Sequence, residues 1–299
     1  MKFSGTILSI LAAWLAWHMV RTTSGRYDTQ EDTFQKRYGD WAIVAGASEG
    51  LGAAWADTLC SFGLNVLLIA RRQDVMTQLA LELQNKYDGR IQVDTAVQDL
   101  MAPDLEEFFS ALLKDERRQY GLLVFNAAHT TIGPFVEHSL ESQYKTVDLN
   151  IRSVMTATHV FANHLKAKTQ TGGIILMSSM AGQLGSAFIA NYAATKAWQT
   201  AFAHALHYEL APDNIDILAC VAGATTTPNY LQQAGQVARN PFIEQTPEDV
   251  VDECVQAMGG ASSVVPGPIN KLARFFLVRL LPLKTALHIF NQETEKLMQ

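Results

Sequence analysis

The stretch WAIVAGASEGLG, residues 41–52, joins an apolar run to a glycine-rich turn. Its first five residues are apolar throughout, which is typical of a strand buried on both faces of a sheet. The glycines at positions 46, 50 and 52 have the spacing G-x-x-x-G-x-G, and a helical pattern follows them. Such a turn lets a phosphate sit at a helix N-terminus, where free N–H groups and the helix dipole favour an anion. The stretch predicts the first β-α unit of a nucleotide-binding fold; a plain structural turn is the alternative.

Short apolar runs alternate with helical patterns along the rest of the chain. Further apolar runs are found at 65–70, 91–97, 121–126, 173–177, 215–221 and 263–265. Segments long enough for helices lie between the runs, at 52–62, 74–86, 104–118, 141–165 and 192–210. This alternation indicates βαβ crossovers, which give a parallel sheet with helices on both faces. We expect an α/β fold with one Rossmann-like, doubly wound parallel sheet of about seven strands.

The composition restricts what this chain of 299 residues can be. Apolar residues make up 48% of it and charged residues 17%, so the chain can bury a large core. The net charge of −6 argues against general nucleic-acid binding, which requires a basic surface. The cysteines, at positions 60, 220 and 254, are too far apart to predict a disulfide framework, so a reducing compartment is the default. The histidines show no metal-ligand spacing, and we expect no metal site.

The N-terminal 21 residues differ from the rest of the chain. Residues 3–20 carry no formal charge apart from His18, with Lys2 before them and Arg21 after them. As a helix, this run would be about 27 Å long, close to the thickness of a hydrocarbon core. We expect residues 1–21 to be a membrane anchor helix, with the next domain facing the cytoplasm because Arg21 and Arg26 follow the run. A cleaved signal peptide and a helix packed on the protein's own surface are the alternatives.

Three further regions are expected after the anchor. Residues 22–39 are polar and mixed in charge, which indicates a linker or a short lead-in helix. Residues 40–270 carry the alternating pattern and form the expected catalytic domain. Residues 271–299 form a C-terminal extension, in which 271–290 hold four basic residues and no acidic one. Contact with a membrane, packing in a dimer and covering of a substrate channel are the alternative roles of this extension.

Tyr192 and Lys196 are spaced as i and i+4, which puts them on one face of a helix. A tyrosine phenol has a pKa of about 10, and a neighbouring ammonium lowers that pKa. Tyr192 is therefore a candidate general acid and base, and Lys196 is the candidate residue that tunes it. The pair considered alone has a plain alternative, because the YxxxK spacing is common on ordinary surface helices.

Other polar residues lie at or shortly after the ends of successive predicted strands. Asp99 follows the third strand, Asn126 ends the fourth and Ser179 follows the fifth. Asn150 lies in the helical segment after the fourth strand. The carboxyl ends of parallel strands meet at one edge of a sheet, where such folds bind ligands. Helix capping and turn formation explain each residue alone, but the set together favours one site.

Two arginines end the second predicted strand. In a dinucleotide-binding fold, an acidic residue there binds the ribose 2′-hydroxyl of NAD, and a basic residue accommodates the 2′-phosphate of NADP. Arg71 and Arg72 occupy the position, and no acidic residue comes before Asp74. We predict NADP(H) rather than NAD(H), with Arg71 as the main ligand of the 2′-phosphate and Arg72 as support. A solvated pair at the start of a helix is the alternative.

Residues 38–270 resemble the short-chain dehydrogenase/reductase family. The motifs that carry the resemblance are AGASEGLG (45–52), FNAA (125–128), LMSSMAG (176–182), YAATK (192–196) and VAGATTT (221–227). The resemblance implies a catalytic tetrad of Asn150, Ser179, Tyr192 and Lys196. Ser179 would hydrogen-bond the substrate oxygen, and Tyr192 would protonate it. Lys196 would hold the nicotinamide ribose, and Asn150 would help hold a water in a proton relay. The resemblance also implies cofactor contacts by Gly46, Ser48, Glu49, Gly50, Leu51, Gly52, Arg71, Asp99, Asn126, Tyr192, Lys196 and Thr225.

The N-terminal half is also similar to membrane-associated hydroxysteroid dehydrogenases and microsomal β-ketoacyl-CoA reductases, through RYGDWAIVAGASEGLG (37–52) and GLNVLLIARR (63–72). Together the resemblances imply an NADP(H)-dependent carbonyl reductase or alcohol dehydrogenase. Its substrate would be an apolar, lipid-like ketone or alcohol, such as a steroid or a long-chain β-ketoacyl thioester. A homodimer or homotetramer is implied as well. The alternatives are a non-catalytic NADP(H)-binding sensor or scaffold, and an epimerase or dehydratase, whose usual G-x-x-G-x-x-G loop this sequence lacks.

Overall fold

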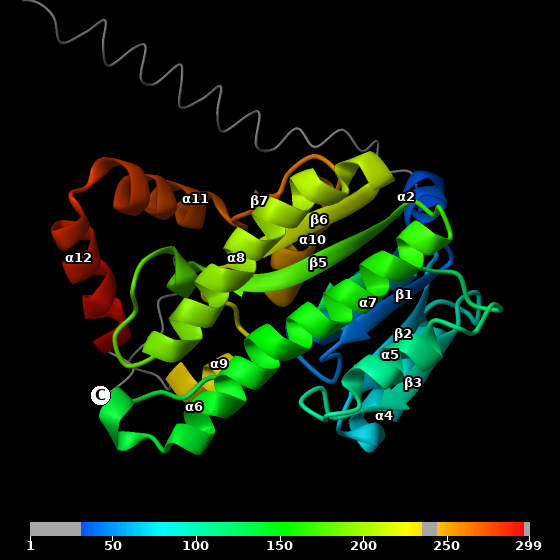
Figure 1. The fold of residues 1–299 in the computed structure, drawn as a ribbon, viewed down its shortest axis with the longest axis horizontal. Helices are drawn as coiled ribbons and strands as arrows, with labels where there is room; N and C mark the ends of the chain where they lie inside the picture. The colour runs from blue at the N-terminus through cyan, green and yellow to red at the C-terminus, as the bar shows by residue number, and fades with distance from the viewer. Residues whose placement is uncertain (1–30, 235–243, 296–299) are drawn as a thin grey trace, which may run out of the picture.

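The computed structural model describes residues 31–234 and 244–295. These residues form seven parallel strands with helices between them (Figure 1). The strands are β1 (Trp41–Ala45), β2 (Asn65–Ala70), β3 (Val93–Val97), β4 (Tyr120–Phe125), β5 (Gly172–Ser179), β6 (Ile215–Ala222) and β7 (Ser263–Val264). The helices are α2 (Glu31–Tyr38), α3 (Leu51–Ser61), α4 (Gln73–Lys86), α5 (Leu105–Leu112), α6 (Leu140–Val147), α7 (Val154–Ala167), α8 (Ala190–Leu210), α9 (Pro228–Ala234), α10 (Pro247–Ala257), α11 (Pro268–Phe275) and α12 (Leu283–Glu295).

The sheet is doubly wound. Its strand order is β3-β2-β1-β4-β5-β6-β7, and every neighbouring pair is parallel. The chain builds one half outward from β1 to β3 and then crosses back to β4, so the winding reverses between β1 and β4. Ligands of such sheets bind at that switch point, beyond the carboxyl ends of the strands. The predicted α/β class, with a single parallel sheet of seven strands, is confirmed.

Two apolar cores cover the two faces of the sheet. Successive side chains of a strand point to opposite faces, and β1 divides accordingly. Val44 packs into the core formed with α3, α4 and α10, and Ile43 packs into the core formed with α5, α7 and α8. The largest completely buried helical side chains are Trp55 on one face and Phe109 and Phe161 on the other. Burial on both faces explains why these strands are apolar without alternation.

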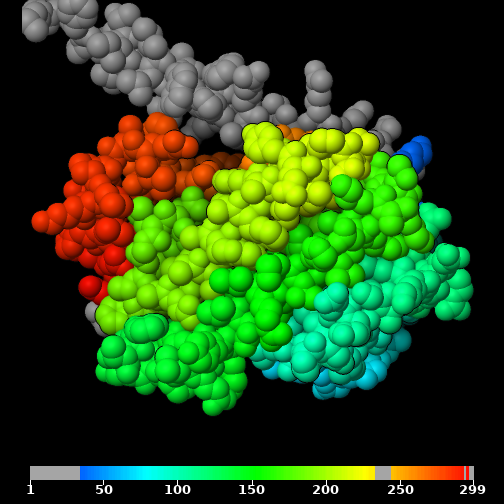
Figure 2. Space-filling model, in the orientation of Figure 1, coloured from blue at the N-terminus to red at the C-terminus, as the bar shows by residue number. Residues whose placement is uncertain are grey.

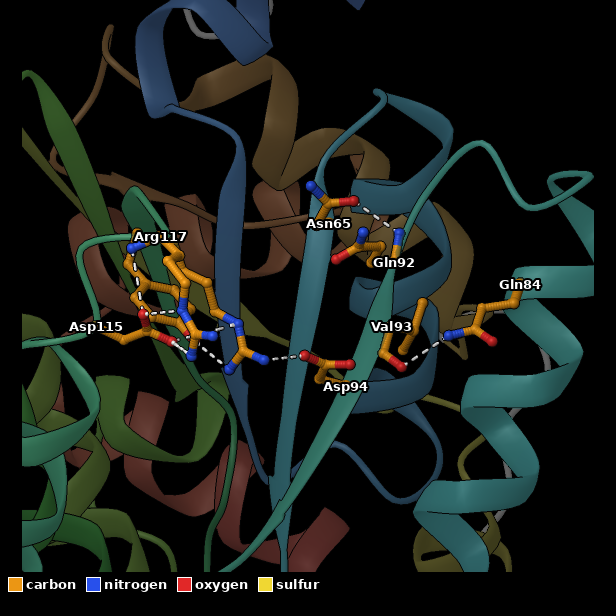
Figure 3. Close-up of polar contacts among 9 residues, drawn as sticks. Asn65, Gln84, Gln92, Val93, Asp94, Asp115 and Arg117 are labelled. Carbon is orange, nitrogen blue, oxygen red and sulfur yellow. Dashed lines mark hydrogen bonds and ion pairs between the residues drawn. The ribbon is translucent and has the colours of Figure 1, made fainter.

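The edge strand β3 is fastened by polar side chains from neighbouring elements (Figure 3). The Gln84 amide donates to the Val93 carbonyl at 3.0 Å, and the Gln92 N–H donates to Asn65 Oδ1 at 2.7 Å. Arg118 forms an ion pair with Asp94. These contacts occupy polar groups along an edge that would otherwise be open to pairing with another chain.

Two predicted helices have different bounds in the structure. The segment predicted as a helix at 104–118 is helical only over α5, because Asp115 accepts hydrogen bonds from the backbone and side chain of Arg117 in a turn. Residues two apart do not face each other on a helix, so this pairing ends it. The segment predicted at 141–165 is interrupted between α6 and α7 by a π-helical stretch, Asp148–Ser153.

The C-terminal helices α11 and α12 form a block at one end of the molecule, orange to red in Figure 2. A π-helical stretch, Phe276–Leu280, joins the first helix to the turn before the second. The predicted start of the extension, at residue 271, falls inside α11. The predicted membrane anchor, residues 1–21, lies outside the described residues, as does the first half of the predicted linker. Within residues 31–234 and 244–295, no helix has both the length and the apolar character that crossing a membrane requires.

Candidate active site

The glycine-rich turn connects β1 to the N-terminus of α3. Gly46 has a φ of +87°, and a Cβ there would lie 2.5 Å from the Ala127 nitrogen. A Cβ at Gly52 would lie 2.1 Å from the Gly46 carbonyl oxygen. Both positions therefore require glycine. Asn126, at the end of β4, donates from Nδ2 to the Gly46 carbonyl at 2.7 Å, so its amide holds the turn in place.

The N-terminus of α3 has no side-chain cap. Gly50 is the residue before the helix, and Leu51 is its first residue. The first N–H groups of a helix lack intrahelical partners, and together with the helix dipole they favour an anion. A Cβ at Gly50 would lie 2.9 Å from the Thr227 side chain, so the segment after β6 passes directly over this turn.

The arginines after β2 have different environments. Arg72 donates to Ser48 Oγ at 2.8 Å and forms an ion pair with Glu49 at 3.0 Å, so it is tied to the glycine-rich turn. Arg71 is exposed and has no hydrogen-bond or ion-pair partner among the described residues. The structure thus leaves Arg71 as the free guanidinium at this corner of the sheet, while the predicted support residue Arg72 is paired with Glu49.

The side chains of Asp99 and Thr225 form local hydrogen bonds, and the backbone of Thr225 pairs with Gln245. Asp99 is exposed and accepts a hydrogen bond from the Met101 N–H at 3.0 Å, a local backbone contact of the kind that its alternative role as a cap involves. Thr225 is buried and donates to the Gly223 carbonyl at 3.1 Å. Neither side chain contacts the Tyr192–Lys196 pair.

Lys196 is buried at the centre of the site, with 2% of its surface exposed. Its Nζ donates to the Met177 carbonyl at 2.6 Å and to Gln199 Oε1 at 3.1 Å. It lies over the Tyr192 ring, 5.5 Å from the ring centre. Burial disfavours the ammonium and lowers the pKa of Lys196 from its ordinary 10.5 to about 7.

Ser179 and Tyr192 face each other across the end of β5. Ser179 is the last residue of β5, and its Oγ accepts from the Ala181 N–H at 3.2 Å. Burial raises the pKa of Tyr192 above its ordinary value, although a hydrogen bond with the Ser179 side chain acts to lower it. The lowering that Lys196 was expected to cause is not found. The neighbouring Ser178 is buried and donates to the Lys196 carbonyl at 2.7 Å, which fixes α8 against the strand.

Asn150 is completely buried in the π-helical stretch before α7. Its side chain accepts from the His129 N–H at 2.9 Å and donates to the His129 carbonyl at 2.9 Å. It also donates to Thr195 Oγ1 at 3.0 Å. Asn150 therefore ties the segment after β4 to α8, one residue from Lys196. The structure brings all four residues of the predicted tetrad together at the carboxyl edge of the sheet.

Two polar residues of this site are absent from the sequence-based set. His129 Nδ1 lies 3.0 Å from Thr146 Oγ1, and burial lowers the pKa of its imidazole. Gln199 connects Lys196 to the backbone of Asn150. A signal for Gln199 was present, since it follows Tyr192 by two helical turns and is a polar residue on the same face of the helix.

The arrangement fits a nicotinamide dinucleotide. The α3 N-terminus offers uncapped N–H groups for a pyrophosphate, and Arg71 offers a free positive charge for an adenosine ribose phosphate. Lys196 uses two of its three N–H donors in the contacts given above. The third remains for a hydroxyl group in the site.

Comparison with known proteins agrees with this geometry. The family model described as short chain dehydrogenase matches residues 40–256. The 7beta-hydroxysteroid dehydrogenase of Mediterraneibacter gnavus is 30% identical over 245 residues, which cover 80% of this chain and 90% of the relative. The very-long-chain 3-oxoacyl-CoA reductase of Neurospora crassa is 28% identical over 227 residues, which cover 75% of this chain and 66% of the relative.

Solved structures share the fold. A 7beta-hydroxysteroid dehydrogenase studied for its stereoselectivity superposes with a TM-score of 0.78 at 24% identity, over 86% of this chain and 98% of the other. A short-chain dehydrogenase from Sphingobium yanoikuyae in complex with NADPH superposes with a TM-score of 0.69 at 24% identity, over 79% and 90% of the two chains. This chain therefore belongs to the short-chain dehydrogenase family, and it is an oxidoreductase that acts on CH–OH groups with a nicotinamide dinucleotide.

Proposed function

We propose that this protein is an NADP(H)-dependent carbonyl reductase or alcohol dehydrogenase acting on an apolar, lipid-like ketone or alcohol. The observation that carries the proposal is the buried Lys196 beside Tyr192, with Ser179 facing the tyrosine at the carboxyl edge of the sheet. A phenol between an ammonium and a hydroxyl can both donate and accept a proton, which interconversion of a carbonyl and an alcohol requires.

The proposed roles follow from the contacts of each side chain. NADPH, when bound, supplies the hydride that reduces the carbonyl carbon. Ser179 donates a hydrogen bond to the carbonyl oxygen, where negative charge develops. Tyr192 donates its phenolic proton to the same oxygen, and Lys196 stabilises the phenolate that remains. Asn150 holds the segment after β4 against α8 and so keeps Lys196 in place. In the oxidation direction, the Tyr192 phenolate accepts the proton of the alcohol.

The preference for NADP(H) over NAD(H) rests on Arg71. Its guanidinium has no hydrogen-bond or ion-pair partner within the part of the chain that the structure describes, and it lies at the end of β2, where a 2′-phosphate would bind. The Sphingobium yanoikuyae enzyme, which shares the fold, was solved with NADPH. The pairing of Arg72 with Glu49 leaves Arg71 as the main determinant of this preference.

The substrate class is proposed from the relatives. One is named for a steroid hydroxyl and another for very-long-chain 3-oxoacyl-CoA, so both names describe a CH–OH or C=O group on an apolar skeleton, the steroid rings or the acyl chain. We propose a steroid or a long-chain β-ketoacyl thioester as the substrate.

Membrane association through residues 1–21, with the catalytic domain facing the cytoplasm, belongs to the same proposal and rests on the uncharged apolar run. A homodimer or homotetramer is supported by exposed apolar side chains along α6 and α7, namely Leu140, Tyr144 and Met155. Flotation of the full-length chain with liposomes tests membrane association. Light scattering of the detergent-solubilised protein tests the oligomeric state.

The decisive experiment is oxidation of NADPH and NADH by the full-length protein in detergent. The substrate panel contains steroid ketones, long-chain β-ketoacyl thioesters and simple aromatic ketones, and Tyr192→Phe is the control. We expect turnover with NADPH that the variant loses by about a thousandfold or more, because general acid catalysis contributes about 10²–10⁴-fold and the ring is otherwise kept. Binding of NADPH without turnover of any ketone or alcohol would instead favour the non-catalytic sensor.

A further inference from the structure

Gln199 connects the two halves of the candidate site through a single buried amide. Its Oε1 accepts from Lys196 Nζ at 3.1 Å, and its Nε2 donates to the backbone carbonyl of Asn150 at 2.8 Å. The residue is 1% exposed. The orientation of the amide is fixed, since turning it over would set an NH₂ group against the ammonium and an oxygen against a carbonyl.

The π-helical stretch provides the acceptor for this amide. Residues of an α-helix interior use their carbonyls within the helix, whereas a π-helical stretch disturbs the regular i to i+4 pattern. Here the Asn150 carbonyl accepts from a side chain 49 residues further along the chain. Gln199 therefore bridges the Lys196 ammonium and the carbonyl of Asn150.

We propose that Gln199 is a positioning residue for Lys196. Its amide accepts from the Lys196 ammonium and donates to the Asn150 carbonyl, and so holds the ammonium in one orientation beside the Tyr192 ring. The inference rests on the proposed reductase function.

The test compares two substitutions that differ in volume and in the access they give to water. Gln199→Leu keeps most of the side-chain volume but removes both polar groups. Gln199→Ala leaves a small cavity between an ammonium and a carbonyl, and a polar cavity of this kind can hold water. If the amide acts through its hydrogen bonds, water in the alanine variant replaces it and leucine does not. If it acts only by packing, leucine replaces it better than alanine.

We expect the Gln199→Leu variant to lose about 10–100-fold in kcat with little change in KM, since it removes a hydrogen bond to a charged group. We expect Gln199→Ala to remain within about threefold of the wild type. Thermal stability should follow the opposite order, with leucine at least as stable as alanine. Equal kcat values for the wild type and Gln199→Leu, or a lower kcat for alanine than for leucine, would overturn the proposal.

A second readout does not depend on turnover. The affinity for NADPH, measured by fluorescence titration, should be weaker for Gln199→Leu than for Gln199→Ala, because the ammonium is held only in the latter. Gln143→Leu is the matched control: this buried glutamine contacts Thr131 and Asn191 and neither Lys196 nor Asn150. It should leave NADPH affinity unchanged. If the wild type binds NADPH but reduces no ketone, the reductase proposal fails. The NADPH affinities of the two Gln199 variants still test the role of Gln199, and equal affinities would contradict that role.

Discussion

Arg71 and Arg72 are adjacent in the sequence but have different electrostatic surroundings. Glu49 and Ser48 bind Arg72, so its positive charge is partly offset within the glycine-rich turn. Arg71 keeps its full charge beside the place for the adenosine ribose. A sequence motif that counts two basic residues therefore overstates the charge available to a 2′-phosphate. Preference for NADP(H) should depend on one arginine and on how firmly Glu49 holds the other.

Substitution of these residues should change the affinity for NADPH and not for NADH. Arg71→Ala should weaken NADPH binding about 10–100-fold, because a hydrogen-bonded charge on the 2′-phosphate is lost. Glu49→Gln should strengthen it by a few-fold, because Arg72 is freed; the effect is small since the pair is half exposed. Fluorescence titration with both cofactors measures the two constants, and Arg90→Ala, another exposed arginine, is the control. An equal loss of NADH affinity in Arg71→Ala would contradict this account.

Among single residues, the sequence identified those whose chemistry is unusual and missed two, His129 and Gln199, whose roles depend on contacts in the fold. Tyr192 and Lys196 have the recognisable spacing of i and i+4, and a pair of titratable side chains on one helix face is a candidate site in any sequence. Gln199 is an uncharged residue whose significance comes from the Asn150 carbonyl, and no local pattern encodes that partner. The predicted cofactor contact of Asp99 has a local explanation in the structure, a hydrogen bond within its own turn.

At the scale of elements, strands were predicted more closely than helices. The bounds of β1 and β2 agree with their apolar runs, because burial on both faces makes the whole strand apolar and its ends sharp. The helices depart where tertiary contacts compete with helical geometry. The Asp115–Arg117 pairing ends α5 early, and the π-helical stretch before α7 presents a carbonyl to α8. Both contacts involve backbone geometry that periodicity in a sequence does not record.

Helix α12 contacts the loop that leads into α8. The Ala187 N–H donates to Asn291 Oδ1 at 2.5 Å, and a Cβ at Gly185 would lie 3.9 Å from the Leu287 side chain. Phe188, which follows Ala187, has a φ of +63°. This backbone conformation is unusual for a bulky residue and needs support from its surroundings. Because this loop separates Ser179 from Tyr192, the helix at the far end of the sequence stabilises the candidate site.

Asn291→Ala should therefore affect substrate use more than the chemical step. The variant loses one hydrogen bond to the loop, with a net value of about 1 kcal/mol, so KM should rise up to about fivefold while kcat changes less. Hydrogen exchange at residues 183–189 should become faster. Gln292→Ala is the control, because its side chain contacts only His288 on the same helix. Unchanged exchange and KM in Asn291→Ala would show that α12 does not support the loop.

At the scale of the whole molecule, the fold places a lysine where its charge is costly. Strand β5 and helix α8 enclose Lys196, which is the one buried lysine or arginine among the described residues, at the carboxyl edge of the sheet. Its partners are a carbonyl and an amide, with no carboxylate to offset the charge. Burial therefore opposes the ammonium, and the pKa falls to about 7. Folding and the ionisation of this residue are thus coupled.

The coupling predicts how stability changes with pH in the protein without cofactor. Below pH 7 the lysine is charged in both the folded and the unfolded state, and the cost of burying the charge is fully present. Between about pH 7 and 10.5 the unfolded chain binds one proton more than the folded chain, so the free energy of unfolding rises with pH. The slope reaches about 1.4 kcal/mol per pH unit for one group. Cysteine, tyrosine and other lysine side chains ordinarily titrate within or near this range, so the contribution of Lys196 must be isolated by a difference.

Lys196→Met provides that difference, because methionine is unbranched and carries no charge while other titrating groups are kept. The free energy of unfolding of the wild type minus that of the variant should rise by about 3 kcal/mol between pH 7 and 9.5, since two and a half pH units each contribute at most about 1.4 kcal/mol. Denaturant titrations at several pH values measure it. A buried lysine that remained charged through a water channel or a hidden carboxylate would give a flat difference over this range. A flat result would show that Lys196 is not a desolvated ammonium, and that such a group does not act on Tyr192. A rise would show that burying the charge of Lys196 beside the phenol lowers the stability of the folded protein.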